Sequence, residues 1–284
     1  MGILSKTKAT TILILLGVIF IVVAVIFRGS GINASGSSLM DLSTFMFGIF
    51  VAFAIANAHS KIRKINEAIN DEEGNTLFVY KSMSLWDEET KNKVQGLIDR
   101  YLIDQIDYYL WDYKYSSKSF MELFDFIATL ECKNDAQKMM CGKMVDVLAD
   151  SLRKRKQVES LVTERMTVTE WMSIVLLLFV NIIYMFNMND GSLLNILTTT
   201  LLAVTSLIFV LILRDLDSLG WKESSWIWEP LDNLFKELGL LPYYPENVIK
   251  TGRIKKTNKE KIRFATYPNK YPDMTGKVIS EIEI

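Results

Sequence analysis

The residues with the most chemical content lie in one uncharged apolar stretch, at residues 42–58. If this stretch is helical, small polar groups and aromatic rings share one face, and that face continues into two lysines. The face consists of Ser43, Phe47, Phe50, Ala54 and Asn57, followed by Lys61 and Lys64. In a ring of identical copies it would line a pore whose aromatic rings form an apolar constriction that gates by dewetting.

Lys61 and Lys64 would then form a basic ring that favours anions at the cytoplasmic mouth of the pore. The alternative is that Phe47 and Phe50 only pack against other helices and that the two lysines only follow membrane topology. A separate face of the same stretch carries Gly48, Ala52 and Ala56 at every fourth position. Small residues at this spacing favour close helix–helix packing in lipid.

Four stretches of the chain are apolar and contain no Asp, Glu, Lys or Arg: residues 9–27, 42–58, 171–188 and 193–213. A helix over residues 9–27 rises about 28 Å, close to the hydrocarbon thickness of about 30 Å. We therefore predict an all-α membrane protein with four transmembrane helices arranged as two hairpins. The first stretch is longer than the core of a signal peptide, so we expect a retained helix.

Basic residues near the ends of the spans set the expected orientation. Lys6 and Lys8 precede the first span, and basic clusters at residues 61–64 and 153–165 lie at the ends of the long middle segment. Both termini and this segment are therefore expected in the cytoplasm. The loop at residues 29–38 and the turn at Asn189 are expected on the outside.

The predicted domains are a first hairpin at 1–58, a cytoplasmic helical region at 59–167, a second hairpin at 168–213, an interfacial segment at 214–241 and a basic tail at 242–284. The 109-residue middle region is expected to form three or four amphipathic helices. The first and last of these should continue from the neighbouring spans, with breaks near residues 73–75, 86–87 and 115–117.

The C-terminal part of the chain mixes helical and strand signals. Trp221, Trp226 and Trp228 favour a membrane interface, and Pro230 is expected to open a short helix that ends at Gly239. Beyond it, alternating residues predict short strands at 248–254, 261–266 and 277–284. This basic tail could bind lipid headgroups, or it could be an ordinary solvated surface.

Composition excludes several kinds of chemistry. The net charge of −1 excludes a globally basic nucleic-acid binder, and one His and two Cys leave little scope for metal or histidine-based catalysis. We expect Cys132 and Cys141 to be free, structural thiols. The acidic triplets at residues 71–73 and 87–89 are expected to be solvated charge runs, with a cation-sensing loop as the alternative. We predict no catalytic residues, no metal site and no cofactor.

The chain resembles the bestrophin-like membrane proteins, a prokaryotic family related in pattern to bestrophin anion channels. The resemblance rests on FMFGIFVAF at residues 45–53, Glu72-Glu73, LIDRY at 97–101, LRDLD at 213–217, EPL at 229–231 and LFKEL at 234–238. It implies a helical protomer with four spans in the inner membrane of a prokaryote. It also implies a pentamer whose second span lines the pore, with Phe47 and Phe50 as neck residues.

The sequence thus favours a homo-oligomeric ion channel that prefers anions such as chloride, surrounded by membrane lipids. A second interpretation is a non-conducting membrane scaffold or sensor whose cytoplasmic helices bind a partner. An intramembrane enzyme is disfavoured, because no span contains an ionisable residue.

Overall fold

The computed structural model describes residues 6–26, 29, 34–108, 110–219, 229–250 and 261–283. The chain forms two compact units. The membrane unit comprises Met1–Arg63 and Arg165–Trp221, and the extramembrane unit comprises Lys64–Glu164 and Lys222–Ile284. Each unit combines two separate stretches of sequence, so the middle segment of the chain folds together with the C-terminal residues.

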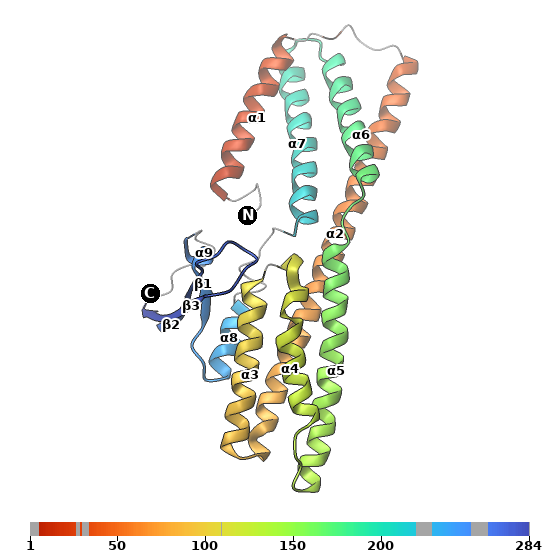
Figure 1. Ribbon diagram of the computed structural model, residues 1–284. Helices are drawn as coiled ribbons and strands as arrows, with labels where there is room; N and C mark the ends of the chain where they lie inside the picture. The colour runs from red at the N-terminus through yellow and green to blue at the C-terminus, as the bar shows by residue number, and fades with distance from the viewer. Residues whose placement is uncertain are drawn as a thin grey trace. The chain divides into compact units, whose positions relative to one another are not determined.

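Within the described residues, the membrane unit contains α1 (Lys6–Ile26), the first part of α2 (Ala34–Ser82), α6 (Val168–Asn187) and α7 (Leu193–Asp217) (Figure 1). Helices α2, α6 and α7 are long and apolar enough to cross a membrane. In α1 the apolar segment is shorter, at Ile14–Ile26. Three of the four predicted spans therefore recur as apolar helices of spanning length.

Local capping sets the start of the second helical hairpin. Thr167 and Glu170 form a capping box at the first turn of α6, and the Ser192 hydroxyl accepts from the backbone N–H of Asn195 at the start of α7. Helix α7 packs against both α1 and α6. The short turn between α6 and α7 makes these two helices antiparallel.

Helix α2 departs from two predictions. It begins at Ala34, so the expected outer loop at residues 29–38 is shorter than predicted. It also continues without interruption to Ser82, so the predicted break at residues 73–75 is wrong. A helix of this length rises about 74 Å, more than twice the hydrocarbon thickness. Within this helix the uncharged apolar stretch is residues 42–58, and basic residues begin at Lys61.

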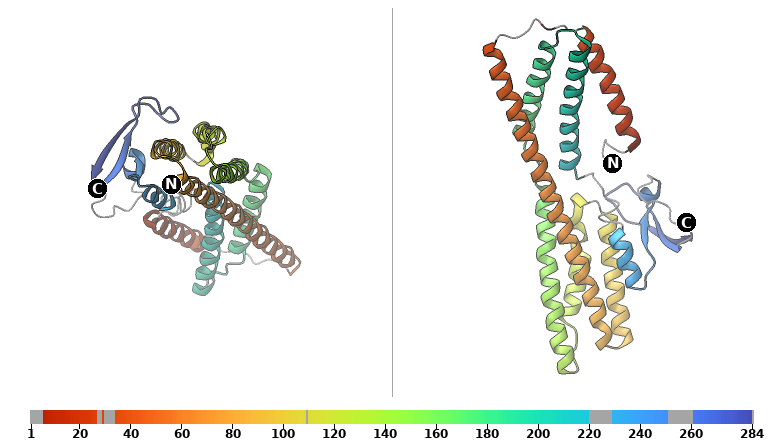
Figure 2. Two further views of the ribbon diagram at one scale, coloured as in Figure 1. Left: turned by 90° about the horizontal axis from the view of Figure 1, so that it is seen from below. Right: turned by 180° about the vertical axis from the view of Figure 1, so that it is seen from behind.

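In the extramembrane unit, α3 (Glu88–Asp107), α4 (Ser117–Ala128) and α5 (Asp135–Thr163) gather around the second part of α2 (Figure 2). Two short 3₁₀ helices, η1 (Met83–Leu85) and η2 (Leu110–Ser116), connect them. The predicted breaks at 86–87 and 115–117 are confirmed, because Asp87 caps α3 and α4 begins at Ser117. The predicted continuity into the third span is wrong, since α5 ends at Thr163 and α6 begins at Val168.

The C-terminal part forms α8 (Glu229–Glu237), β1 (Tyr243–Pro245), α9 (Glu246–Lys250), β2 (Lys261–Thr266) and β3 (Val278–Glu283). Strand β2 lies in the centre of the sheet, parallel to β1 and antiparallel to β3. The predicted strands at 261–266 and 277–284 match β2 and β3. The strand predicted from residue 248 is wrong over the described residues, which form α9. Trp221, Trp226 and Trp228 lie outside the described residues.

The sheet is attached to α3 by charged and phenolic groups. Arg263 on β2 forms two hydrogen bonds of 2.7 Å with the Asp99 carboxylate, which is a bidentate ion pair. Tyr243 and Tyr267 both donate to Oδ1 of Asp107. Strands β1 and β2 also contribute buried residues to the core of the extramembrane unit, namely Tyr243, Tyr244, Ile262 and Ala265.

Candidate functional site

The membrane part of α2 has one face that packs inside its own protomer. Phe47 and Val51 are buried, with exposed fractions of 6% and 3%. They share an apolar cluster with residues of α6 and α7, namely Ile174, Leu178, Val210 and Leu213. Only 11% of the apolar window of α2 is buried, compared with 28% for α7. Most of the membrane surface of α2 is therefore uncovered within one protomer.

The structure divides the predicted pore-lining residues between two faces of α2. Phe47 is buried in the protomer, Ala54 packs beside it, and Ser43 is half-buried. Phe50 and Asn57 are exposed on a different face, and the Phe50 ring is 47% exposed. The predicted stripe therefore does not form one continuous surface, because α6 and α7 cover half of it.

The other predicted positions lie away from the protomer core. Gly48, Ala52 and Ala56 are all exposed, and a Cβ placed on Gly48 would have no neighbouring atom within 4 Å. The small-residue face therefore makes no close contact at Gly48 with the described part of its own protomer. Lys61 is half-buried and Lys64 is exposed, and they lie about one and two turns beyond the apolar stretch.

Among the exposed residues of α2 that the sequence prediction did not name, two share a face with Phe50 and Asn57. Phe53 is 72% exposed and Met46 is 41% exposed. On a helix of 3.6 residues per turn, they lie on the same face as Phe50 and Asn57. The spacing of these four residues was available in the sequence. The spacing alone does not show which face of α2 is covered by α6 and α7.

Polar side chains fix the helices of the membrane unit to one another. Thr44 on α2 donates to Asn181 on α6 at 2.9 Å, a hydrogen bond between two apolar helices. Asp217 at the end of α7 accepts from the backbone N–H of Met166 at 3.1 Å and from the indole of Trp171 at 3.3 Å. These bonds set the register of α2, α6 and α7.

A buried ionic network lies in the extramembrane unit. Arg155 on α5 is fully buried and forms a 2.8 Å ion pair with Glu72 on α2, which is 2% exposed. The guanidinium also donates to the Tyr101 hydroxyl and, at 2.8 Å, to the Ser116 hydroxyl. The Tyr113 hydroxyl donates to the other carboxylate oxygen of Glu72. The network thus joins α2, α3, η2 and α5.

Burial dominates the electrostatics of this network. Burial raises the pKa of Glu72, although Arg155 and the Tyr113 hydroxyl favour its ionised form. Burial and the neighbouring Glu72 charge raise the pKa of Glu73 to about 8. The Oε1 atom of Glu73 is buried and has no hydrogen-bond partner among the described residues. Glu72 and Glu73 therefore differ in their surroundings. Glu72 is paired with the Arg155 guanidinium, whereas Glu73 Oε1 has no such partner among the described residues.

The prediction that residues 71–73 form a solvated charge run is wrong for Glu72. Its neighbour Asp71 is exposed and pairs with Lys154 at 2.7 Å. The second triplet behaves differently, since the Asp87 side chain is exposed and accepts from Thr90 as the cap of α3. A helical periodicity that places Glu72 beside Ile65, Ile69 and Val79 was the available signal. Its partner Arg155 lies 83 residues away in sequence, beyond local pattern analysis.

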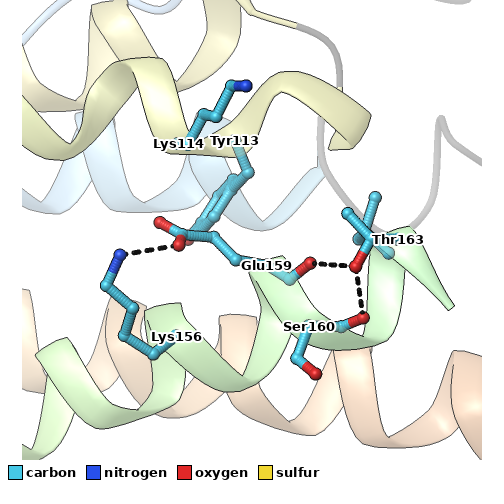
Figure 3. Close-up of a pocket in the computed structure, with 7 residues that line it drawn as sticks. Tyr113, Lys114, Lys156, Glu159, Ser160 and Thr163 are labelled. Carbon is cyan, nitrogen blue, oxygen red and sulfur yellow. Dashed lines mark hydrogen bonds and ion pairs between the residues drawn. The ribbon is translucent and has the colours of Figure 1, made fainter.

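A cavity of about 360 Å³ opens beside the network (Figure 3). It lies between η2 and α5, and Tyr113 forms part of its wall. Its lining consists of Tyr113, Lys114, Lys156, Glu159, Ser160, Val162 and Thr163. Lys156 and Glu159 form an ion pair at 2.7 Å, and Thr163 donates to backbone oxygens of α5. Much of the polar lining is therefore satisfied by the protein itself.

The apolar helices and the polar contacts between them define a helical integral membrane protein, and sequence comparison gives its family. The profile of the Bestrophin-like domain matches residues 9–218. The chain belongs to the bestrophin-like family. The match covers all but the first three described residues of α1, includes α2 to α7, and ends before α8 and the sheet. No curated protein matches the chain with significance.

Solved structures with the same fold include a substituted variant of a bacterial bestrophin homolog from Klebsiella pneumoniae. It is 10% identical, with a TM-score of 0.66, over 80% of this chain and 99% of that one. A second variant of the homolog has a TM-score of 0.63 at 10% identity, over 80% of this chain and 98% of that one. A structure described as a membrane protein has a TM-score of 0.65 at 11% identity, over 81% and 98% of the two chains. At these identities the similarity establishes the fold.

Proposed function

We propose that this protein is a homo-oligomeric bestrophin-type ion channel whose pore is lined by α2. Each protomer contributes four membrane spans in this proposal, with α1 as the first. The pore-lining face consists of Met46, Phe50, Phe53 and Asn57, continued by Lys64. This face keeps Phe50, Asn57 and Lys64 from the predicted stripe. Met46 and Phe53 take the place of Phe47 and Ala54, which pack within the protomer.

The exposure of the aromatic rings on α2 carries this proposal. Phe50 and Phe53 are 47% and 72% exposed in the protomer, although each ring is large enough to fill a core position. Rings from several copies would meet at a common axis and form an apolar constriction. Bestrophin-type channels are oligomers by family analogy, and a pentamer is the expected assembly.

The small-residue face supports assembly through α2. Gly48, Ala52 and Ala56 are exposed on a third face of α2. It is distinct from the buried face with Phe47 and from the exposed face with Phe50 and Phe53. Small residues permit two helices to approach closely, which large residues would prevent. A neighbouring copy is therefore the proposed occupant of this face.

Topology and charge give the proposed selectivity. We place both termini and the extramembrane unit in the cytoplasm of a prokaryote, with the spans in the plasma membrane among lipids. Lys64 is then exposed at the cytoplasmic end of the pore-lining face, with Lys61 one turn closer to the membrane. A ring of lysines at this position favours anions such as chloride.

The test is halide efflux from proteoliposomes that contain the purified full chain. We expect flux from the unsubstituted protein and faster flux from Phe50→Ala and Phe53→Ala, because truncation widens an apolar constriction. Phe179→Ala is the matched control, since that ring on α6 is 61% exposed but lies outside the proposed pore face. Lys64→Gln should reduce the preference for chloride over sodium without closing the pore.

Two results would contradict the proposal. Flux that is equally unaffected by the Phe50, Phe53 and Phe179 substitutions would place the constriction elsewhere. Absence of flux from protein shown to be folded and inserted would favour the scaffold or sensor interpretation. The extramembrane unit would then be examined for a bound partner.

A further inference from the structure

The two cysteines of the chain lie next to each other in the extramembrane unit. Cys132 belongs to the connection between α4 and α5, and Cys141 lies near the start of α5. The two thiols interact with each other, and both are free and partly buried. Their spacing in sequence matches no redox motif, so the sequence predicted separate structural roles. The fold instead makes them a pair.

Both thiols are held at the end of α4. Cys141 Sγ donates to the backbone oxygen of Ile127 at 3.3 Å, and Cys132 Sγ donates to the backbone oxygen of Leu130 at 3.5 Å. These two carbonyl groups belong to the last turn of α4 and the residues that follow it. The sulfur atoms therefore share one anchoring region, although they come from different segments.

The connection that carries Cys132 is itself fixed by neighbouring elements. Gln137 on α5 accepts from the backbone N–H of Lys133 at 2.6 Å and donates to the backbone oxygen of Leu85 at 2.8 Å. The Trp86 indole donates to the backbone oxygen of Glu131 at 3.2 Å. Residues on both sides of Cys132 are thus held in place, which keeps its thiol beside Cys141 and favours intramolecular reaction.

We propose that Cys132 and Cys141 form a reversible disulfide when hydrogen peroxide oxidises the protein. The Cys132 thiolate attacks one peroxide oxygen, so an S–O bond forms and the O–O bond breaks. The released hydroxide takes up a proton and leaves as water. The Cys141 sulfur then attacks the Cys132 sulfenic acid, so an S–S bond forms and a second hydroxide leaves as water. The two thiols lose two electrons together, and the peroxide gains them.

The order of the two steps follows from the environment of the thiols. Burial and the neighbouring Cys132 raise the pKa of Cys141, which lowers its thiolate fraction at neutral pH. In this proposal Cys132 reacts with the peroxide, and Cys141, whose thiolate is disfavoured by burial, is the resolving thiol. The disulfide ties the α4–α5 connection to α5. In the proposed cytoplasmic location, cellular reductants keep the pair reduced until peroxide is present.

The test uses the full chain in detergent or lipid, treated with hydrogen peroxide and then with a thiol-alkylating reagent. We expect a mass decrease of about 2 Da per chain, no alkylation at either cysteine, and a linked peptide that contains residues 132 and 141. Dithiothreitol should restore the original mass and both alkylation sites. Hydrogen exchange at residues 129–141 should be slower in the oxidised protein.

Single substitutions make the experiment discriminating. In Cys132→Ser, Cys141 should stay alkylatable at the peroxide concentration that closes the pair in the unsubstituted chain. In Cys141→Ser, Cys132 should accumulate as a sulfenic acid or pass to higher oxides. Disulfide-linked dimers as the main product would overturn the proposal, as would independent oxidation of each thiol in the unsubstituted chain. None of these readouts depends on ion flux, so failure here is separate from failure of the channel proposal.

Discussion

Replacement of Arg155 by Met tests the buried ionic network most directly. The guanidinium is fully buried, and its 2.8 Å partner Glu72 is 2% exposed. Removing one partner of such a pair leaves an uncompensated buried charge, which costs about 3–5 kcal/mol. At about 2–4 °C per kcal/mol for a domain of this size, the apparent Tm should fall by about 6–20 °C. The double variant Glu72→Gln/Arg155→Met should lose less than the sum of the single variants.

The assay is thermal unfolding of the purified protein in detergent, followed by tyrosine and tryptophan fluorescence. Lys154→Met is the matched control, because Lys154 and Asp71 precede Arg155 and Glu72 on the same two helices and pair at 2.7 Å on the surface. Its effect should be indistinguishable from the unsubstituted protein, since exposed ion pairs are screened by water. Equal losses for Arg155→Met and Lys154→Met would refute the assignment of the network as a buried clamp.

Three further predictions concern other contacts. Glu73→Gln should flatten the pH dependence of Tm. A carboxyl whose pKa is raised from 4.5 to about 8 contributes stability that is present below pH 4.5 and is lost as pH rises through 8. An unchanged slope of Tm between pH 6 and 9 would contradict this. Arg263→Met removes the bidentate contact to Asp99. Amide hydrogen exchange in β2 and β3 should then become at least tenfold faster, equivalent to about 1.5 kcal/mol or more. Unchanged exchange rates would refute this prediction. Asp217→Leu should shift the fluorescence emission of Trp171, because its indole loses the Asp217 carboxylate as hydrogen-bond acceptor. An unshifted emission spectrum would show that the Trp171–Asp217 hydrogen bond does not persist in solution.

The sequence predicted features that depend on local pattern. Alternation over residues 261–266 located β2, and the break predicted at residues 86–87 located the start of α3, because both signals lie within a few residues of the element. The uninterrupted course of α2 was not predictable in this way. Gly74 is a helix breaker by propensity, but Thr76 and Val79 bury one face of the same helix against the extramembrane core. Tertiary packing therefore outweighs the local preference at this position.

The candidate site shows the same division between local and long-range information. Helical spacing in α2 groups residues into faces, but it does not say which face meets α6 and α7. Phe47 and Phe50 are three residues apart and similar in type, yet Phe47 is 6% exposed and Phe50 is 47% exposed. Glu72 and Glu73 differ for an equivalent reason, because only Glu72 faces Arg155. In both cases the decisive partner comes from a distant part of the chain.

The three faces of α2 restrict what each can contact in the proposed assembly. The face with Phe47 is already occupied by α6 and α7. Lipid would cover leucine as well as alanine, so a recurrence of small residues at Gly48, Ala52 and Ala56 has a physical purpose only where another helix approaches closely. If that helix is α2 of a neighbouring copy and the ring closes, the remaining face with Phe50 and Phe53 is directed toward the axis. The aromatic constriction and the small-residue contact are therefore consequences of one arrangement, and evidence against either weakens both.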